Sequence, residues 1–297
     1  MTVRQILDVL EIRTKVVSVS GFAVGTVYAA RHTATDDATG NVAASVILFA
    51  AILAVDMGTT GFNSFFDFLR GVDRRGVNRE HDKVLVNDRV PALPVFLLSF
   101  GLYLTAMIFG VWLSFLVGFE ILLVGAISVT VGFLYNTGPI PLSSTPLGEV
   151  FAGGFLGWVL VTLSIYVHTG TLDGTDMLVG VPSFLMVASI LTVNNTCDIE
   201  SDRAAGRKTL SIVVGRRVST VIAVLLGVCA YASSAVLAFR GVFPQNALYL
   251  LAAACIVSAF IYRTMILRGL VAGTKGISMQ SILYIFVAFS LAVAWPL

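Results

Sequence analysis

Long apolar runs, each about the length of a membrane-crossing helix, recur along the whole 297-residue chain. A hydrocarbon core about 30 Å thick needs a helix of roughly 20 apolar residues to cross it. Hydrophobic residues make up 57% of the chain and charged residues 12%, about half the charged fraction of a soluble domain. The sequence therefore predicts an all-α polytopic membrane protein. We expect nine transmembrane helices in a single bundle, near residues 15–31, 42–66, 90–111, 114–135, 148–168, 177–197, 217–239, 244–263 and 277–296.

Two places in this pattern are less regular. Residues 1–14 carry apolar Ile6, Leu7 and Leu10 between charged residues, which predicts a short amphipathic helix at the membrane surface. Between the third and fourth runs, the shortest of the expected breaks is a turn from Gly110 to Ser114.

The basic residues predict the orientation of the bundle. With the N-terminus inside, all of the 19 Lys and Arg residues except Arg31 and Arg240 fall on the inner side. The positive-inside rule then places this side in the cytoplasm, so we expect a multi-pass protein of the cell membrane. Arg263, Arg268 and Lys275 are interpreted as topology determinants only.

Two polar stretches end the second and sixth apolar runs with a shared pattern. The residues are Asn63, Asp67 and Asp73 in the first stretch and Asn194, Asp198 and Asp202 in the second. In each stretch an Asn precedes an Asp by four residues, so the two side chains share a helix face. The two runs lie four spans apart and cross in the same direction, which indicates a weak internal repeat. The expected halves are about 15–135 and 148–263, with an extra helix at 277–296.

Acidic and basic side chains alternate in these two stretches. Carboxylates from two facing helices provide the hard oxygen ligands that suit Mg²⁺ or Mn²⁺, which in turn bridge to phosphates. The same loops carry the basic residues Arg70, Lys83, Arg203, Arg207 and Lys208. This combination is typical of a metal–diphosphate site, in which acids hold the metal and bases hold phosphate oxygens. The alternative is that the loops are charged only because they are wet; the shared spacing of two loops argues against it.

One further acid lies within the second run. Asp56 precedes Asn63 by one heptad, so Asp56, Thr60, Asn63 and Asp67 form a polar stripe that we expect to face the bundle interior. An ionisable residue at that depth is costly unless it meets a partner or a wet cavity. A structural hydrogen bond and a direct functional role both remain open for Asp56.

A third inner loop contains little basic charge. It runs from Tyr135 and Asn136 through Gly138 and two prolines to Glu149. An aromatic ring, an amide and a carboxylate beside a metal site could bind a flat polar ring, so these three residues are candidate acceptor ligands. The alternative is an ordinary helix–helix turn that proline stops.

These motifs resemble those of the UbiA superfamily of intramembrane aromatic prenyltransferases, and within it the 1,4-dihydroxy-2-naphthoate polyprenyltransferases of menaquinone synthesis. The matching patterns are Asn63-x3-Asp67-x2-Arg70-Gly71-x-Asp73, Asn194-Asn195-x2-Asp198-x3-Asp202-Arg203-x2-Gly206-Arg207-Lys208, and Tyr135-x2-Gly138-Pro139-x-Pro141-Leu142 with Leu147-Gly148-Glu149. The likeness extends over nearly the whole chain. The chain departs from the branch at residues 74–83 and at Glu11–Thr14, where Arg-Pro is commoner.

The resemblance implies a single domain over residues 1–297 with a central cavity that opens to the cytoplasmic side. It implies Mg²⁺ held by Asp67, Asp73, Asp198 and Asp202, with help from Asn63 and Asn194. Arg70, Lys83, Arg207 and Lys208 would bind the leaving diphosphate.

The implied substrates are a polyprenyl diphosphate and 1,4-dihydroxy-2-naphthoate. Other acceptors stay open within the class: 4-hydroxybenzoate, homogentisate, a porphyrin-derived ring or a glyceryl lipid. The rival outside the class is a divalent-cation or proton-coupled transporter. No nucleic-acid partner is expected, and the sequence does not indicate an oligomeric state.

Overall fold

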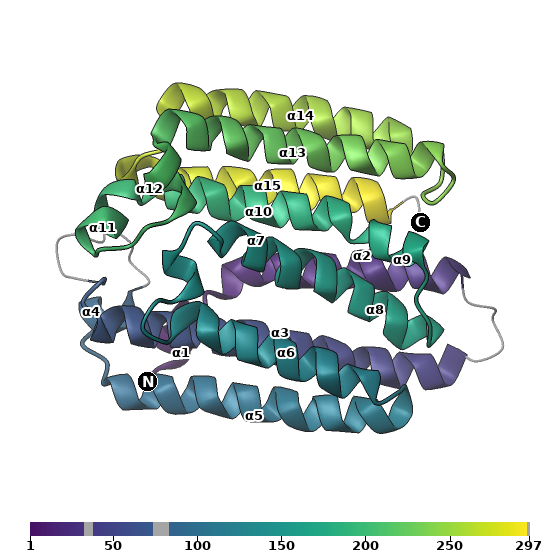
Figure 1. Cartoon of the computed structure of the whole chain (residues 1–297), viewed down its shortest axis with the longest axis horizontal. Helices are drawn as coiled ribbons and strands as arrows, with labels where there is room; N and C mark the ends of the chain where they lie inside the picture. Colours follow the sequence, from purple (N-terminus) through teal and green to yellow (C-terminus); the bar gives the residue numbers. More distant parts are fainter. Residues whose placement is uncertain (33–37, 74–82, 296–297) are drawn as a thin grey trace.

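The computed structural model describes residues 1–32, 38–73 and 83–295, and long helices dominate this part of the chain (Figure 1). The long helices are α2 (Val16–His32), α3 (Ala38–Leu69), α5 (Ala92–Leu116), α6 (Glu120–Asn136), α8 (Leu160–Thr169), α10 (Val181–Cys197), α13 (Arg216–Phe239), α14 (Ala247–Arg268) and α15 (Lys275–Ala294). Short helical segments connect or extend them. They are α1 (Val3–Val9), η1 (Ile12–Lys15), α4 (Val84–Asn87), η3 (Leu142–Ser144), α7 (Gly148–Ala152), η4 (Gly153–Val159), α9 (Gly174–Val179), α11 (Ile199–Ala204), α12 (Leu210–Val214) and η5 (Ala272–Thr274). The predicted inner residues Arg74, Arg75 and Arg79 lie outside the described residues.

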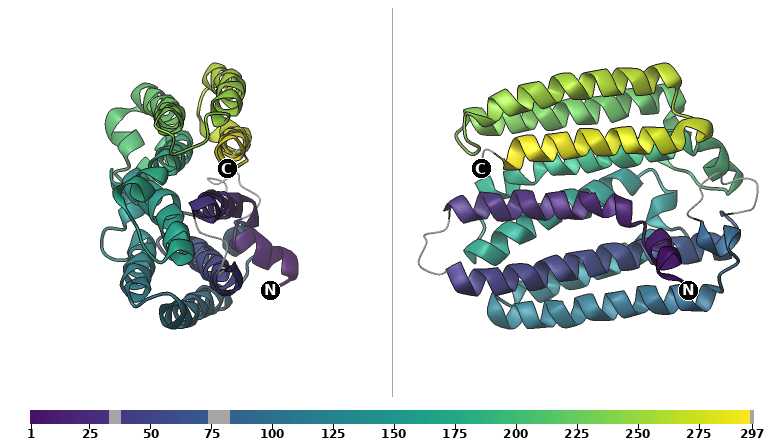
Figure 2. Two further views of the ribbon diagram at one scale, coloured as in Figure 1. Left: turned by 90° about the vertical axis from the view of Figure 1, so that its right-hand side faces the viewer. Right: turned by 180° about the vertical axis from the view of Figure 1, so that it is seen from behind.

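Seven helical segments of the described chain are long and apolar enough to cross a membrane. They are Val42–Leu69, Ala92–Leu116, Gly148–Thr169, Gly174–Cys197, Arg216–Phe239, Ala247–Arg268 and Ala272–Ala294. Helices α2 and α6, with 17 residues each, lie alongside them in Figures 1 and 2. The all-α, multi-pass architecture is confirmed, whereas the count of nine membrane crossings stays a prediction.

The expected turn from Gly110 to Ser114 is wrong. Helix α5 continues through both residues to Leu116, and the chain turns at residues 117–119. A single glycine inside a helix costs only about 1 kcal/mol, which the surrounding apolar run offsets. The turn itself uses Gly118, where an added Cβ would approach Glu120 Oε2 to 2.6 Å and Tyr166 Oη to 2.8 Å.

The N-terminal amphipathic helix is shorter than expected. Helix α1 begins after a capping box between Thr2 and Gln5 and ends at Val9. Glu11 then adopts a left-handed conformation (φ 46°), which breaks the helix. Val9 and Leu10 are buried against Val84 and its neighbours near the end of the bundle.

The helices pack in pairs around the middle of the bundle, as the end-on view in Figure 2 shows. Helix α3 packs against α5, α10 against α13, α2 against α8, and α14 against α15. The largest apolar core lies among α2, α8, α10 and the last three helices, with Met186, Phe286 and Phe289 fully buried. The carboxyl ends of α3 and α10 meet at one end of the bundle, together with α4, α11 and α12 (Figure 1).

Candidate active site

A cavity of about 1620 Å³ runs through the bundle and unites most of the predicted site residues. Its polar end is lined by both acidic motifs: Asn63, Asp67, Asp73, Asn194, Asp198 and Asp202. Its remaining walls are largely apolar and extend to Leu48, Leu113 and Ile121, which lie toward the other end of the helices. Specific ligand sites are commonly apolar pockets with a few converging polar groups. In this cavity both acidic motifs lie at one end, and Asp56 lines the wall further along α3.

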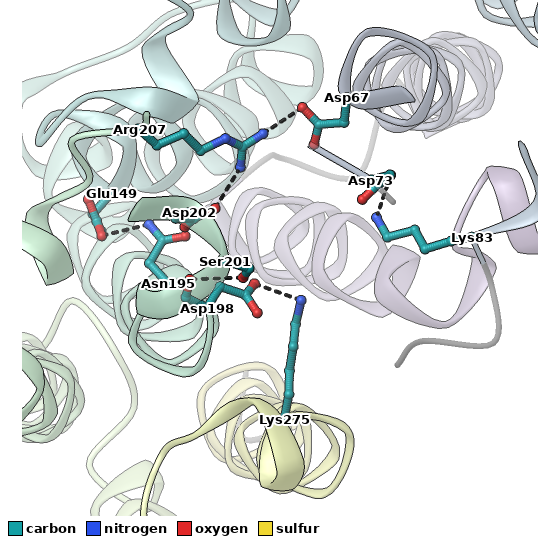
Figure 3. Close-up of polar contacts among 10 residues, drawn as sticks. All are labelled: Asp67, Asp73, Lys83, Glu149, Asn195, Asp198, Ser201, Asp202, Arg207 and Lys275. Carbon is teal, nitrogen blue, oxygen red and sulfur yellow. Dashed lines mark hydrogen bonds and ion pairs between the residues drawn. The ribbon is translucent and has the colours of Figure 1, made fainter. Parts of the chain in front are cut away.

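Arg207 joins the two acidic motifs (Figure 3). Its guanidinium nitrogens lie 2.5 Å from Asp67 Oδ1 and 3.2 Å from Asp202 Oδ1. Asp67 is 5% exposed and Asp202 4%, so these are largely desolvated ion pairs. The two motifs, 140 residues apart at the Asp67–Arg207 contact, therefore come close enough to share one cation.

The other two acids have their own cations. Lys83 Nζ lies 3.5 Å from Asp73 Oδ2, and Lys275 Nζ lies 2.7 Å from Asp198 Oδ2 (Figure 3). Across the part of the chain that the structure describes, no three acid, histidine or cysteine side chains are grouped closely enough to hold a metal ion. The carboxylates are thus spaced by basic groups rather than packed against one another.

These contacts shape the ionisation of the site. Burial raises the pKa of Asp202 to about 6, with Arg207 acting in the opposite direction. Burial alone would lower the pKa of Arg207, but Asp67 and Asp202 more than offset it, so the net shift is upward. The guanidinium therefore stays charged between the two acids.

Both motifs owe their shape to a glycine. Gly71 (φ 65°) and Gly206 (φ 78°) are left-handed and each follows an aspartate by four residues. The next backbone N–H then donates to the carbonyl of that aspartate: Val72 to Asp67 and Arg207 to Asp202, both at 2.9 Å. Glycine adopts this conformation without the steric cost of a Cβ. The turns bring Asp73 and Arg207 back toward the helix ends that carry the acids.

Comparison with known proteins identifies this architecture. The profile of the UbiA prenyltransferase family matches residues 18–269. The chain belongs to the UbiA prenyltransferase family. The 1,4-dihydroxy-2-naphthoate octaprenyltransferase of Bacillus subtilis (strain 168) is 31% identical over 183 residues, which cover 59% of this chain and 58% of that protein. The chain thus matches somewhat more than half the length of this relative.

Solved structures share the fold of this UbiA-family chain. The apo structure of a UbiA homolog from Aeropyrum pernix K1 superposes with a TM-score of 0.70 at 17% identity, covering 93% of this chain and 97% of that one. A UbiA homolog from Archaeoglobus fulgidus, bound to DMAPP and Mg²⁺, gives a TM-score of 0.66 at 14% identity, covering 97% and 99%. The resemblance inferred from the motifs is confirmed at the level of family and fold.

Not all the basic residues predicted for this UbiA-family site face the cavity. Lys83 and Arg207 line it. Arg70 instead donates to the carbonyls of Asn136 (2.7 Å) and Gly138 (3.2 Å) at the end of α6. Lys208 is exposed and is not part of the cavity lining. A diphosphate-binding role for Arg70 and Lys208 stays a prediction.

Of the three predicted acceptor ligands, two line the cavity and one does not. Tyr135 and Asn136 line the cavity. The Asn136 amide donates to the Thr59 carbonyl of α3 at 2.8 Å. Glu149 is 3% exposed, lies outside the lining, and accepts from the Asn195 amide at 2.9 Å. Asn195 does line the cavity, so Glu149 supports a cavity residue rather than facing the cavity itself.

Two ion pairs were not foreseen from the sequence. Asp56 pairs with buried Lys15 at 2.7 Å and accepts from Ser18 at 2.7 Å, which supplies the partner that its depth requires. The whole predicted stripe from Asp56 to Asp67 lines the cavity. The interpretation of Lys275 as a topology determinant only is wrong, because its side chain contacts Asp198 within the cavity. Nothing in the chain's spacing relates Lys275 to the acids, since the contact depends on how α15 packs.

The residues present fit a Mg²⁺–diphosphate group. The aspartates offer oxygen atoms as metal ligands. Mg²⁺ is typically coordinated by one or two carboxylates and completes its coordination shell with water and substrate phosphates. Among the described residues, the buried Arg207 Nε and Asn136 Oδ1 have no hydrogen-bond partner. One donor and one acceptor at the site therefore remain available to a ligand. Three cations at the same end complement phosphate oxygens.

Proposed function

We propose that this chain is a Mg²⁺-dependent prenyltransferase that joins a polyprenyl group from an isoprenyl diphosphate to an aromatic acceptor. The observation that carries this proposal is the meeting of two acidic motifs, bridged by Arg207, over one end of a long apolar cavity. The polar end suits the diphosphate and the apolar length suits an isoprenoid tail. The A. fulgidus homolog of the same fold, bound to DMAPP and Mg²⁺, supports this assignment.

The proposed role of each residue follows from its place in the cavity lining. Asp67, Asp73, Asp198 and Asp202, with Asn63 and Asn194, would hold Mg²⁺, which when bound supplies Lewis-acid stabilisation of the departing diphosphate. Arg207 and Lys83 would pair with phosphate oxygens as negative charge builds on them. The apolar walls exclude water from the allylic cation that remains. An electron-rich carbon of the acceptor then attacks this cation.

We propose 1,4-dihydroxy-2-naphthoate as the acceptor, with loss of CO₂, and hence a step in menaquinone synthesis. The B. subtilis relative supports this choice, as does the turn from Tyr135 to Glu149. Tyr135 and Asn136 are the proposed acceptor contacts because both line the cavity beside the acids.

The deciding experiment supplies purified protein with labelled prenyl diphosphate, Mg²⁺ and a panel of acceptors, followed by mass spectrometry of the product. We expect a prenylated, decarboxylated naphthoate product that EDTA prevents from forming. A product on 4-hydroxybenzoate, homogentisate, a porphyrin-derived ring or a glyceryl lipid would correct the acceptor alone.

The transporter alternative predicts metal- or proton-coupled flux into vesicles and no prenylated product. The cavity argues against it, because the four aspartates of the two motifs gather at one end and a basic group contacts each of these four. A permeating cation would meet those positive charges first.

A further inference from the structure

Lys275 opens helix α15 and turns its side chain into the cavity rather than to solvent. Its Nζ lies 2.7 Å from Asp198 Oδ2, and the side chains are 17% and 18% exposed. Figure 3 shows it approaching the acids from the side opposite to Arg207. A residue that only sets membrane topology needs positive charge near the interface and no such contact.

The position of Lys275 is unfavourable for its own helix. The amino end of a helix carries partial positive charge, which disfavours a cation in the first turn. Lys275 is the first residue of α15, so the local structure gives no reason for a lysine. One interaction that compensates for this is the ion pair with Asp198, 77 residues away in sequence.

The wall around Lys275 is open. Gly273 and Gly276 line the cavity on either side of it, and a Cβ added to either would meet no atom within 4 Å. Lys275 itself lines the cavity between these two glycines. A second anionic group could reach it there without displacing the backbone.

We propose that Lys275 binds the diphosphate of the prenyl donor, and that it exchanges its contact with Asp198 for a phosphate oxygen when the donor and metal arrive together. This inference rests on the proposed function of the cavity. In the substrate-free protein the ammonium shields Asp198 from its neighbours; in the complex it neutralises the leaving group. Lys275 thereby joins Arg207 and Lys83 as a third cation, contributed by the last helix.

The exchange has a signature that a structural lysine would not show: opposite effects on two binding reactions. Mn²⁺ alone must compete with the ammonium for Asp198, so Lys275→Met should bind Mn²⁺ more tightly, by about two- to five-fold. Farnesyl diphosphate with Mn²⁺ gains a charge-assisted hydrogen bond from Lys275, so the same variant should bind it roughly ten- to hundred-fold more weakly.

The experiment titrates full-length protein in nanodiscs with Mn²⁺ alone, followed by electron paramagnetic resonance, and with farnesyl diphosphate at fixed Mn²⁺, followed by calorimetry. Lys275→Arg should keep donor binding within about five-fold because it keeps the charge. Arg268→Met, which removes an exposed cation near the same helix end, should change neither titration. Lys275→Gln gives the same comparison if Lys275→Met fails to fold.

Unchanged donor affinity in Lys275→Met would overturn the proposal. So would an equal weakening of Mn²⁺ and donor, which would mean that Lys275 only positions Asp198. If the wild-type protein binds Mn²⁺ but no prenyl diphosphate, the proposed function itself fails and this inference fails with it. If wild type and Lys275→Met bind the donor equally well, the inference about Lys275 fails and the proposed function of the cavity is unaffected.

Discussion

Asp67 and Glu149 are both buried carboxylates near the cavity, and their partners separate their roles. Asp67 lines the cavity and contacts Arg207. Glu149 lies outside the cavity lining and accepts a hydrogen bond from the Asn195 amide through Oε1. A carboxylate that faces substrate is needed for its charge. A carboxylate that accepts a hydrogen bond from a neighbouring amide is needed for its shape and for its acceptor oxygen.

Asp67→Asn tests the first role. We expect prenyl transfer to fall by about 10²-fold or more, since the variant removes one preplaced charge from the diphosphate end. The isosteric amide should leave the protein folded in detergent. Turnover with labelled donor and a thermal unfolding curve check both statements. Asp88→Asn, an acid outside the cavity lining, is the control; full activity in Asp67→Asn would contradict the metal role.

Glu149 provides a paired comparison. Glu149→Ala leaves the Asn195 amide unpaired in a buried site, which costs about 1–3 kcal/mol, so the free energy of unfolding and turnover should both drop. Glu149→Gln keeps an oxygen for that amide and should retain most of both. Chemical denaturation and initial rates give the two readouts. Equal damage in both variants would show that the charge of Glu149 is required.

Tyr135→Phe tests the acceptor side. Removing the hydroxyl should raise the KM for the naphthoate acceptor and leave the KM for the prenyl donor unchanged, because the proposed contact is with the acceptor ring. Steady-state kinetics with each substrate varied in turn measures this. The reverse pattern would move Tyr135 to the donor end of the cavity.

At the scale of elements, the left-handed glycines set the shape of both motif loops. Gly206 (φ 78°) follows α11 at the site, and Gly170 (φ 71°) caps α8 near the opposite end of the bundle. In both places an added Cβ meets no atom within 4 Å. Replacing either glycine with alanine should therefore cause the same backbone strain. The two positions differ in their neighbours, because Gly206 precedes Arg207 of the site.

Gly206→Ala and Gly170→Ala should each lose about 1–2 kcal/mol of stability, the cost of a left-handed non-glycine residue. Only Gly206→Ala should also lose turnover, because Arg207 follows it directly and bridges Asp67 and Asp202. Thermal unfolding and initial rates separate the two effects. Equal loss of turnover in both variants would show that stability alone limits activity.

Much of the site was predictable at this scale because it depends on local spacing. Asn-x3-Asp at the end of two helices places the Asn and Asp of each motif on one helix face, and the length of the apolar runs locates the helices. The contact of Lys275 with Asp198 was not predictable, since it depends on the packing of α15 against α10. The contacts of Arg70 were also not predictable: its motif position suggests phosphate, and the structure shows that it donates to two carbonyls at the end of α6. The weak internal repeat stays a prediction.

At the scale of the whole molecule, the described basic residues and both acidic motifs share one end of the bundle, apart from Arg31 and Arg240 at the opposite helix ends. We propose that this end faces the cytoplasm. The proposal can be tested without disturbing the site, because exposed residues lie at both ends.

Val213→Cys, 64% exposed in α12, should resist a membrane-impermeant maleimide in intact cells and react after lysis. Gln245→Cys, exposed in the loop before α14, should react in intact cells. Labelling of the unsubstituted protein measures the background from its native cysteines. If Val213→Cys reacts in intact cells and Gln245→Cys does not, the proposed orientation is the reverse of the true one.

The cavity of about 1620 Å³ has a consequence for where binding free energy can arise. Lipid acyl chains are as apolar as its walls, so an isoprenoid moving from the bilayer into the protein leaves one hydrocarbon solvent for another. Lengthening the tail would then add little attraction, unlike the same transfer from water. Selectivity for the donor would reside almost entirely in its charged headgroup, and donors of different lengths would compete on nearly equal terms in a native membrane.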